Sequence, residues 1–199
     1  MTLAKVCTEN EKKNFGEVEP LPYLRRCLFA AVAAILAIAI SNRPALAEDG
    51  FFKGANGAPA LLTVGAGAIG VLADRDEAYL FSAEYRAGPA LEFFFIRPSL
   101  GLIVTTDKSL YGFFGLSGDI YFGKHVVLTP QLAVGGYSAG DGQDLGGILE
   151  FKSGVVLAWR FDNESRLGIG LHHISNANIY DENPGTELLT AFYSHPINF

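Results

Sequence analysis

The sequence predicts an all-β fold, namely an eight-stranded antiparallel transmembrane β-barrel of the bacterial outer membrane. Three observations lead to this prediction. After residue 47, segments that alternate apolar with small or polar residues recur between short polar turns, which is the pattern of half-buried strands. One face of these segments is predominantly apolar. Aromatic side chains gather near the segment ends, as they do at membrane interfaces.

The length and composition fit a single domain with a low content of charged residues. The chain has 199 residues, of which 49% are hydrophobic and only 18% are charged, and its formal net charge is −6. Soluble globular domains usually carry more charge, on about 25% of their residues. The acidic balance argues against nucleic acid as a partner, because domains that bind nucleic acid are typically basic.

The N-terminal segment has the features of a secretory signal. An arginine pair at 25–26 precedes a short apolar run, and an Ala-x-Ala motif follows at 45–47. We therefore predict that residues 1–47 are removed and that residues 48–199 form a single barrel domain. The alternative is an N-terminal anchor that is retained. Both cysteines precede the cleavage site, so the mature chain would suit an oxidising compartment.

Eight strand segments follow one another along the mature chain. Gly, Asp, Asn and Pro in the connections favour tight turns. The expected strands, each with the turn residues that follow it, are about 61–72 (Asp74–Asp76), 78–87 (Gly88-Pro89), 91–106 (Asp107-Lys108), 109–122 (Gly123-Lys124), 125–138 (Gly140–Gly142), 147–161 (Asp162-Asn163), 165–175 (Asn183–Gly185) and 186–199.

The two faces of these segments decide between a membrane barrel and a soluble one. In segment 147–161 the face that begins at Leu149 is almost entirely apolar, while the other face includes Glu150, Lys152 and Arg160. An outer-membrane barrel turns the apolar face to lipid and the polar face to its interior. A soluble lipocalin-like barrel, with the apolar face inside, is the alternative. The interior charges either pair with one another or line a narrow pore.

The C-terminus supports the membrane barrel. The chain ends on Phe199, and Ile197 and Tyr193 share its strand face. Such an ending resembles the assembly signal of bacterial outer-membrane barrels. The outer-membrane assembly machinery is therefore an expected partner.

A polar cluster at the outer end of the last two strands is the candidate site. By strand periodicity His173 and Ser175 project from the apolar face, whereas His172 points inward. Glu187 lies on the lipid-facing side of the last strand by the same rule. Polar groups that face lipid are costly and therefore indicate function. Because His172 and His173 point apart, we expect no shared metal ion.

These residue types suit ester hydrolysis. The imidazole of His173 can take the proton of Ser175, and the carboxylate of Glu187 can fix its tautomer and stabilise the imidazolium. The side-chain amide of Asn176 can donate to an oxyanion, and backbone N–H groups near Ala177 and Asn178 can supply a second donor. Structural roles are the alternative: His173 as a structural histidine, Ser175 and Asn176 as turn residues, and Glu187 as a solvated charge at the barrel rim. Glu182 is a rival for the role of the carboxylate.

The run His173-Ile174-Ser175-Asn176-Ala177, followed by Asn183, Gly185 and Glu187, resembles the active-site strand pair of the PagL-type lipid A 3-O-deacylases. In that family a His-x-Ser-Asn pattern and a glutamate fourteen residues after the histidine form the triad, and here Glu187 stands fourteen residues after His173. The resemblance implies an eight-stranded outer-membrane barrel. It assigns the base to His173, the nucleophile to Ser175, the orienting carboxylate to Glu187 and the oxyanion donor to Asn176.

The expected function is that of a serine-type hydrolase that removes the 3-position acyl chain of lipid A in the outer leaflet. Lipid A, as part of lipopolysaccharide, is the expected partner, and the chemistry needs no metal or organic cofactor. The alternatives are a structural or small-pore barrel without catalytic activity, and a soluble lipocalin-like binding protein. A homodimer of barrels is left open.

Overall fold

Antiparallel strands make up most of the computed structural model, which describes residues 57–71, 78–93 and 95–197. The predicted signal at 1–47 and the C-terminal Phe199 lie outside these residues, so both remain predictions. The described elements are β1 (Ala60–Ile69), β2 (Ala78–Arg86), the 3-10 turn η1 (Pro89–Leu91), β3 (Ile96–Thr105), β4 (Leu110–Gly118), β5 (Ile120–Phe122), β6 (Val126–Ser138), β7 (Leu149–Arg160), β8 (Arg166–Ser175) and β9 (Thr186–Ile197).

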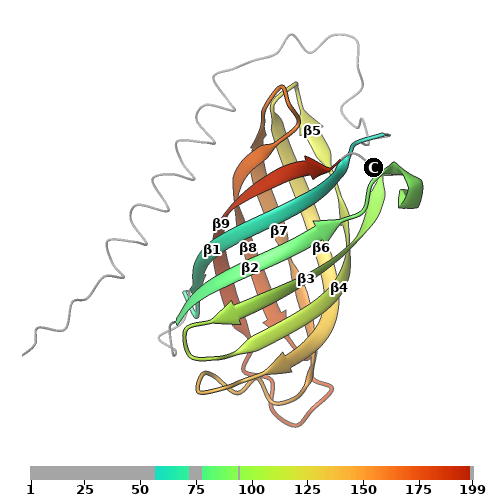
Figure 1. Cartoon of the computed structure of the whole chain (residues 1–199). Helices are drawn as coiled ribbons and strands as arrows, with labels where there is room; N and C mark the ends of the chain where they lie inside the picture. Colours follow the sequence, from blue (N-terminus) through green and yellow to red (C-terminus); the bar gives the residue numbers. More distant parts are fainter. Residues whose placement is uncertain (1–56, 72–77, 94, 198–199) are drawn as a thin grey trace, which may run out of the picture. The chain divides into compact units, whose positions relative to one another are not determined.

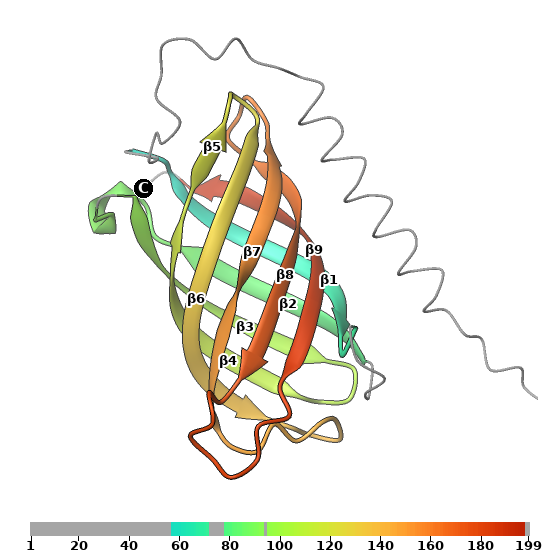
Figure 2. The same ribbon diagram turned by 180° about the vertical axis from the view of Figure 1, so that it is seen from behind.

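The strands close into a barrel of eight (Figures 1 and 2). Strands β1 to β4 and β6 to β9 pair in chain order, while β1 also pairs with β9 and β4 with β6, so the described strands leave no open edge. Strand β5 continues β4 along β6 in the same register, after the pairing with β6 is interrupted at residues 118 and 119. Pro130, which has no N–H, lies opposite Gly118 there. The predicted eight-stranded antiparallel barrel is therefore confirmed.

The start of the third barrel strand differs from the prediction. We expected a strand from residue 91, but β3 begins at Ile96. Pro89 instead starts η1, and Phe93 and Ile96 then exchange two backbone hydrogen bonds of 3.0 Å. Proline fixes its own φ and lacks a donor, so it favours this turn over an earlier strand.

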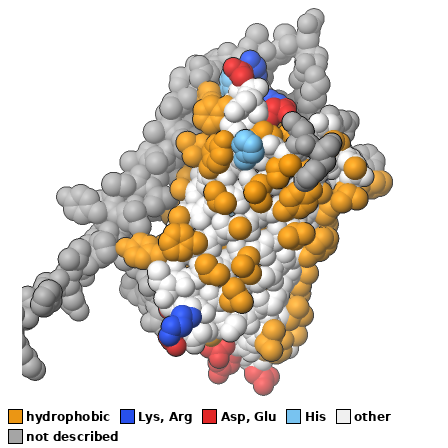
Figure 3. Space-filling model, viewed as in Figure 1, with side chains coloured by type: hydrophobic (Ala, Val, Ile, Leu, Met, Phe, Trp, Pro, Cys, Tyr) orange, Lys and Arg blue, Asp and Glu red, His pale blue; other side chains and the backbone are white. Residues whose placement is uncertain are grey.

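The outer wall of the barrel is apolar. Large apolar side chains point away from the interior, with exposures that reach 56% for Phe114 and 68% for Leu132. Figure 3 shows such side chains spread over the wall, with Lys, Arg, Asp and Glu at the two ends. A lipid-facing barrel presents this surface, whereas the soluble lipocalin-like alternative needs its apolar face inside. Within the described ranges, no helix has the length and apolarity needed to cross a membrane.

A buried ion cluster fills the interior at the end where β1 begins and β9 ends, which we call the periplasmic end. At its centre the carboxylate of Asp119 accepts hydrogen bonds from Arg86 at 3.1 Å, Arg97 at 2.5 Å and Arg166 at 2.8 Å. The Thr129 hydroxyl donates a further bond of 2.7 Å. All five side chains are at most 5% exposed, so each charge depends on its partners for stabilisation.

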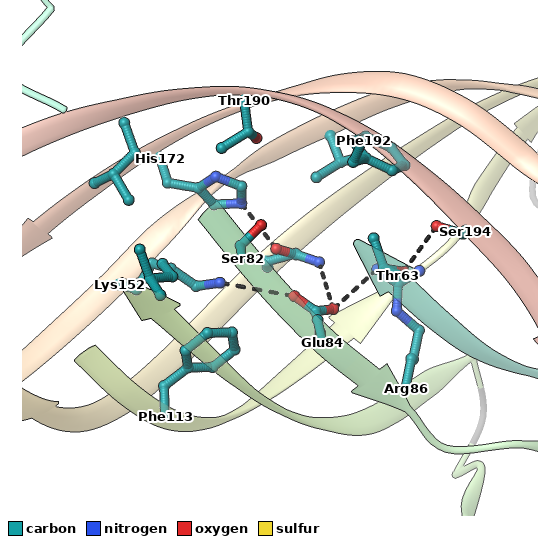
Figure 4. A pocket seen from close by; sticks show the side chains of 14 residues that line it. Thr63, Ser82, Glu84, Arg86, Phe113, Lys152, His172, Thr190, Phe192 and Ser194 are labelled. Carbon is teal, nitrogen blue, oxygen red and sulfur yellow. Dashed lines mark hydrogen bonds and ion pairs between the residues drawn. The ribbon is translucent and has the colours of Figure 1, made fainter. Parts of the chain in front are cut away.

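A polar layer crosses the middle of the interior (Figure 4). Glu84 lies 3.8 Å from Nζ of Lys152 and accepts a hydrogen bond of 3.2 Å from Gln131. Oε1 of Gln131 lies 2.8 Å from Nε2 of His172. These side chains border a cavity of about 50 Å³, which has room for a few water molecules.

Apolar side chains close the opposite, outer end of the interior. Because these layers fill the interior of the described barrel, they favour the first of the two predicted roles of the interior charges, pairing with one another, and not the second, lining a narrow pore. The apolar cluster at the outer end consists of Ile69, Ala78, Leu80, Ile103, Tyr111, Phe113, Tyr137, Leu145, Ile174 and Leu188.

Glu150 is the exception among the interior charges, because neither of its buried carboxylate oxygens has a hydrogen-bond partner among the described residues. Gly135, which has no side chain, lies opposite it on β6, and Lys152 points to Glu84 instead.

Candidate active site

Strand β8 carries two adjacent histidines that point to opposite sides of the barrel wall. His172 is only 8% exposed and faces the interior, whereas 48% of the His173 side chain is exposed on the outer wall. This alternation follows from the two-residue period of a strand. Both histidines thus have the orientation predicted from the sequence. Across residues 57–71, 78–93 and 95–197, no group of three or more His, Cys, Asp or Glu side chains could hold a metal ion.

Glu187 lies directly opposite His173 in the β8–β9 pair. Its Oε1 is 3.4 Å from Nδ1 of the imidazole, and 25% of its side chain is exposed. The distance is slightly longer than an ordinary N–H···O bond. A carboxylate beside Nδ1 leaves Nε2 available to a nucleophile. The rival carboxylate, Glu182, lies in the loop and contributes its backbone carbonyl to Asn176.

Ser175 ends β8 on the same face as His173 and is partly exposed. Two residues along a strand span about 6.6 Å, and no hydrogen bond joins Ser175 to His173 among the described residues. Such catalytic hydrogen bonds often tighten only when substrate binds. The structure therefore brings the three predicted triad residues to one patch of the outer wall and pairs two of them.

Gly185 packs against the imidazole of His173, a contact that the sequence alone did not reveal. Its φ is +59°, and a Cβ at this position would lie 2.8 Å from Cε1 and 3.1 Å from Nε2 of His173. Glycine therefore satisfies two demands here: it adopts the left-handed conformation, and it leaves room for the ring. From the sequence, Asn183-Pro184-Gly185 suggested only a turn.

Asn176 connects the residues that follow Ser175 to neighbouring loops. It is 0% exposed, and its Nδ2 donates to the carbonyls of Leu145 at 2.9 Å and Glu182 at 2.7 Å. Its Oδ1 accepts from the Asn178 N–H, and its own N–H donates to Oδ1 of Asn183, both at 3.0 Å. Both hydrogens of this amide are engaged. The predicted donation to an oxyanion would therefore require one of these bonds to break.

The chain turns tightly just after Asn176. The N–H of Ile179 donates to the carbonyl of Asn176 at 3.1 Å, and the two central residues, Ala177 and Asn178, have φ values of 54° and 60°. These are features of a type I′ turn. Alanine in this conformation is strained by about 1 kcal/mol or more, and such strain clusters at functional sites. The Ala177 N–H has no acceptor among the described residues.

A family model and solved structures match this chain. The model of the lipid A 3-O-deacylase (PagL) family matches residues 56–196. The chain belongs to the PagL family. The crystal structure of the outer membrane enzyme PagL aligns with a TM-score of 0.51 and 20% identity, over 69% of this chain and 99% of that chain. The Yersinia pestis outer membrane protein Ail, in a phospholipid bilayer nanodisc, aligns over the same shares with 14% identity and a TM-score of 0.42. No curated protein sequence matches significantly.

Membership of the PagL family agrees with the surface of this barrel. The apolar outer wall and the closed strands are those of a protein that lies in the bacterial outer membrane. Around the three predicted triad residues the wall is apolar as well: Phe151 lies opposite Ser175 on β7, and Leu171 and Leu189 are the next lipid-facing residues on β8 and β9. The polar patch of this PagL-family barrel therefore borders a surface suited to acyl chains.

Replacing Gly185 by alanine is expected to displace the His173 ring in this PagL-family protein. The new Cβ cannot keep its 2.8 Å approach to Cε1, and alanine adds left-handed strain of about 1–2 kcal/mol. We expect Gly185→Ala to lower the deacylation rate at least about tenfold, corresponding to about 1.4 kcal/mol, in a barrel that still folds.

The matched control is Gly136→Ala, because a Cβ at Gly136 would meet no heavy atom within 4 Å. Rates would be measured on purified barrels whose folding is confirmed by heat-dependent mobility in gels. Equal rates for Gly185→Ala and Gly136→Ala would show that the contact between Gly185 and His173 does not affect the deacylation rate.

Proposed function

We propose that the protein hydrolyses the 3-position ester of lipid A in the outer leaflet, with a Ser175–His173–Glu187 triad. One observation carries the proposal: His173 and Glu187 lie opposite each other at 3.4 Å on the lipid-facing wall. Ser175 shares that face, in a chain that belongs to the PagL family. Polar groups in this position are costly unless they serve a function.

The first step forms an acyl-enzyme. Oγ of Ser175 attacks the ester carbonyl carbon while Nε2 of His173 accepts the hydroxyl proton. The resulting imidazolium is stabilised by the Glu187 carboxylate beside Nδ1. Collapse of the tetrahedral intermediate breaks the bond to the sugar oxygen, and His173 returns the proton to that oxygen. The products are a free sugar hydroxyl and an acyl group on Ser175.

The second step uses water. His173 takes a proton from a water molecule, whose oxygen attacks the acyl carbonyl carbon. The ester bond to Ser175 breaks, and the proton returns to Oγ of the serine. Because 48% of the His173 side chain is exposed on the outer wall, access to the base requires no opening motion of the barrel.

The oxyanion is stabilised by the turn after Ser175. The Ala177 N–H lies two residues after Ser175 and has no acceptor among the described residues, so it is free to donate to the oxyanion. Asn176 holds this turn in place through its hydrogen bonds to Leu145 and Glu182. The Asn176 amide becomes a second donor only if it exchanges one of these carbonyls for the oxyanion.

Mass spectrometry of lipid A tests this proposal directly. A Gram-negative host that expresses the wild-type chain should lose one 3-linked hydroxyacyl group from its lipid A, and a host that expresses Ser175→Ala should not. The same loss in Ser175→Ala would refute the mechanism. Unchanged lipid A beside a folded wild-type barrel would favour the structural barrel, with no ester hydrolysis. A homodimer remains a prediction that cross-linking in the membrane can test.

A further inference from the structure

The loop that joins β6 to β7, residues 139–148, lies beside the loop that joins β8 to β9 at the outer end of the barrel (Figures 1 and 2). It carries none of the triad residues. Its tip is polar and exposed at Asp141 and Asp144. Leu145, by contrast, is 0% exposed. Leu145 is therefore the one fully buried residue of this loop, whose other residues are exposed or partly exposed.

Leu145 is buried in the outer end of the barrel interior. It belongs to the apolar cluster that includes Tyr137, Ile174 and Leu188. Ile174 stands between His173 and Ser175 on β8, and Leu188 follows Glu187 on β9. The Leu145 side chain thus belongs to the layer that backs the triad strands from the inside.

The backbone of the same loop is bonded to the residues after the nucleophile. The carbonyl of Leu145 accepts a hydrogen bond of 2.9 Å from Nδ2 of Asn176, which follows Ser175 directly. Gly146, with a φ of +90°, leaves no space for a side chain between this loop and the carbonyl of Glu182. Burial of Leu145 therefore fixes the acceptor that holds Asn176, and with it the Ala177 turn.

The loop is also bonded beside the base. Nε2 of Gln143 donates to the carbonyl of Gly185 at 3.3 Å, and Gly185 is the residue that packs against the His173 imidazole. The hydroxyl of Tyr137 holds the Gln143 carbonyl at 2.7 Å. One loop is thus hydrogen-bonded on both sides of the proposed triad, to the Asn176 side chain next to Ser175 and to the Gly185 carbonyl next to His173.

The far side of the loop rests on the turn between β3 and β4. The Ser109 hydroxyl donates to the carbonyl of Ala139 at 2.6 Å, and the Asp141 N–H donates to the carbonyl of Asp107 at 2.7 Å. Partial burial disfavours the charged form of Asp107, but hydrogen bonds from Thr105 and Ser109 outweigh it and hold the pKa of this carboxyl below its usual range. The loop is therefore supported from both neighbours.

We propose that the 139–148 loop positions the triad, and that Leu145 is the positioning residue that anchors it. The proposal rests on the hydrolase function proposed above. Leu145 touches neither substrate nor reacting atoms; it acts through Asn176 and the Ala177 turn. Loss of the anchor should misplace the oxyanion donor and Ser175, which lowers kcat, while the outer wall that binds acyl chains, and therefore KM, stays as it is.

The test compares three leucine variants of the full barrel. Leu145→Ala removes the anchor, Leu145→Met preserves most of its volume, and Leu61→Ala removes the same atoms at the periplasmic end, where Leu61 is 1% exposed. We expect Leu145→Ala to lower kcat on lipid A at least about tenfold with KM within about twofold, and Leu145→Met and Leu61→Ala to stay within about threefold of wild type.

A second readout separates this inference from the proposed function. The rate at which an alkyl fluorophosphonate modifies Ser175 reports nucleophile activation without lipid A. A slow rate for Leu145→Ala only would support the positioning role, whatever the natural substrate. Equal rates for Leu145→Ala and Leu61→Ala would overturn it. A wild-type Ser175 that never reacts would overturn the triad itself and this inference with it.

Discussion

Replacing Ser175 by alanine is expected to lower kcat for lipid A deacylation by on the order of 10⁴-fold, and His173→Ala by a similar factor. Each removes a group that the acyl-enzyme step needs. Because the two act as a unit, the double variant should lose no more activity than either single variant. Glu187→Gln should cost less than either, since the carboxylate orients and stabilises the imidazole without reacting itself.

The measurement is the initial rate of fatty-acid release from lipid A by purified, folded barrels. Ser138→Ala is the matched control: it makes the same chemical change at an exposed strand end, opposite Leu110 rather than on the triad strands, and should leave kcat unchanged. Additive losses in the double variant would mean that Ser175 and His173 act in separate steps, and the triad assignment would have to be given up.

Replacing Asp119 by asparagine is expected to cause the largest loss of stability. Its carboxylate accepts hydrogen bonds from Arg86, Arg97 and Arg166 in a site that is 2% exposed. An amide of the same size leaves Arg97 and Arg166 without a counter-charge, and leaves Arg86 with only Glu84, at 3.4 Å. Breaking a buried ion pair costs about 3–5 kcal/mol, so the free energy of unfolding should fall by about that amount.

Urea unfolding in lipid vesicles, followed by the fluorescence of the single tryptophan, Trp159, measures this change. Asp162→Asn is the control, because Asp162 pairs with Lys124 at the surface, where both side chains are at least 70% exposed, and surface pairs contribute little. An Asp119→Asn barrel as stable as the control would mean that the arginines find other partners. Folded Asp119→Asn should keep its kcat, since the cluster and the triad occupy opposite ends of the barrel.

Much of this architecture could be predicted from sequence because a strand has a simple period. Alternation alone assigned His172 to the interior and His173 to the wall, and turn residues marked the strand ends. The hairpin formed by the last two strands was also expected to bring Glu187 beside His173, as the structure shows. Where the third strand begins was predicted wrongly, because Pro89 started a 3-10 turn whose extent alternation does not show.

The contacts around Asn176 could not be predicted, because they join segments far apart in the chain. Its bond to Leu145 spans 31 residues, and nothing in a local pattern indicates which carbonyl an asparagine will meet. The packing of Gly185 on His173 depends likewise on how the loop returns to β9. Local sequence identifies the reactive groups, while the loops that hold them become visible only in three dimensions.

His173 and Glu187 lie opposite each other on two different strands, so their pairing depends on how the barrel assembles. A slip of one residue between β8 and β9 would turn one of the pair to the lumen and leave the other outside. Before β8 and β9 have paired, the chain therefore contains the residues of the proposed triad but not their arrangement. On the mechanism proposed above, activity therefore requires that β8 and β9 pair in the correct register, so that assembly of the barrel and activation of the enzyme are the same event.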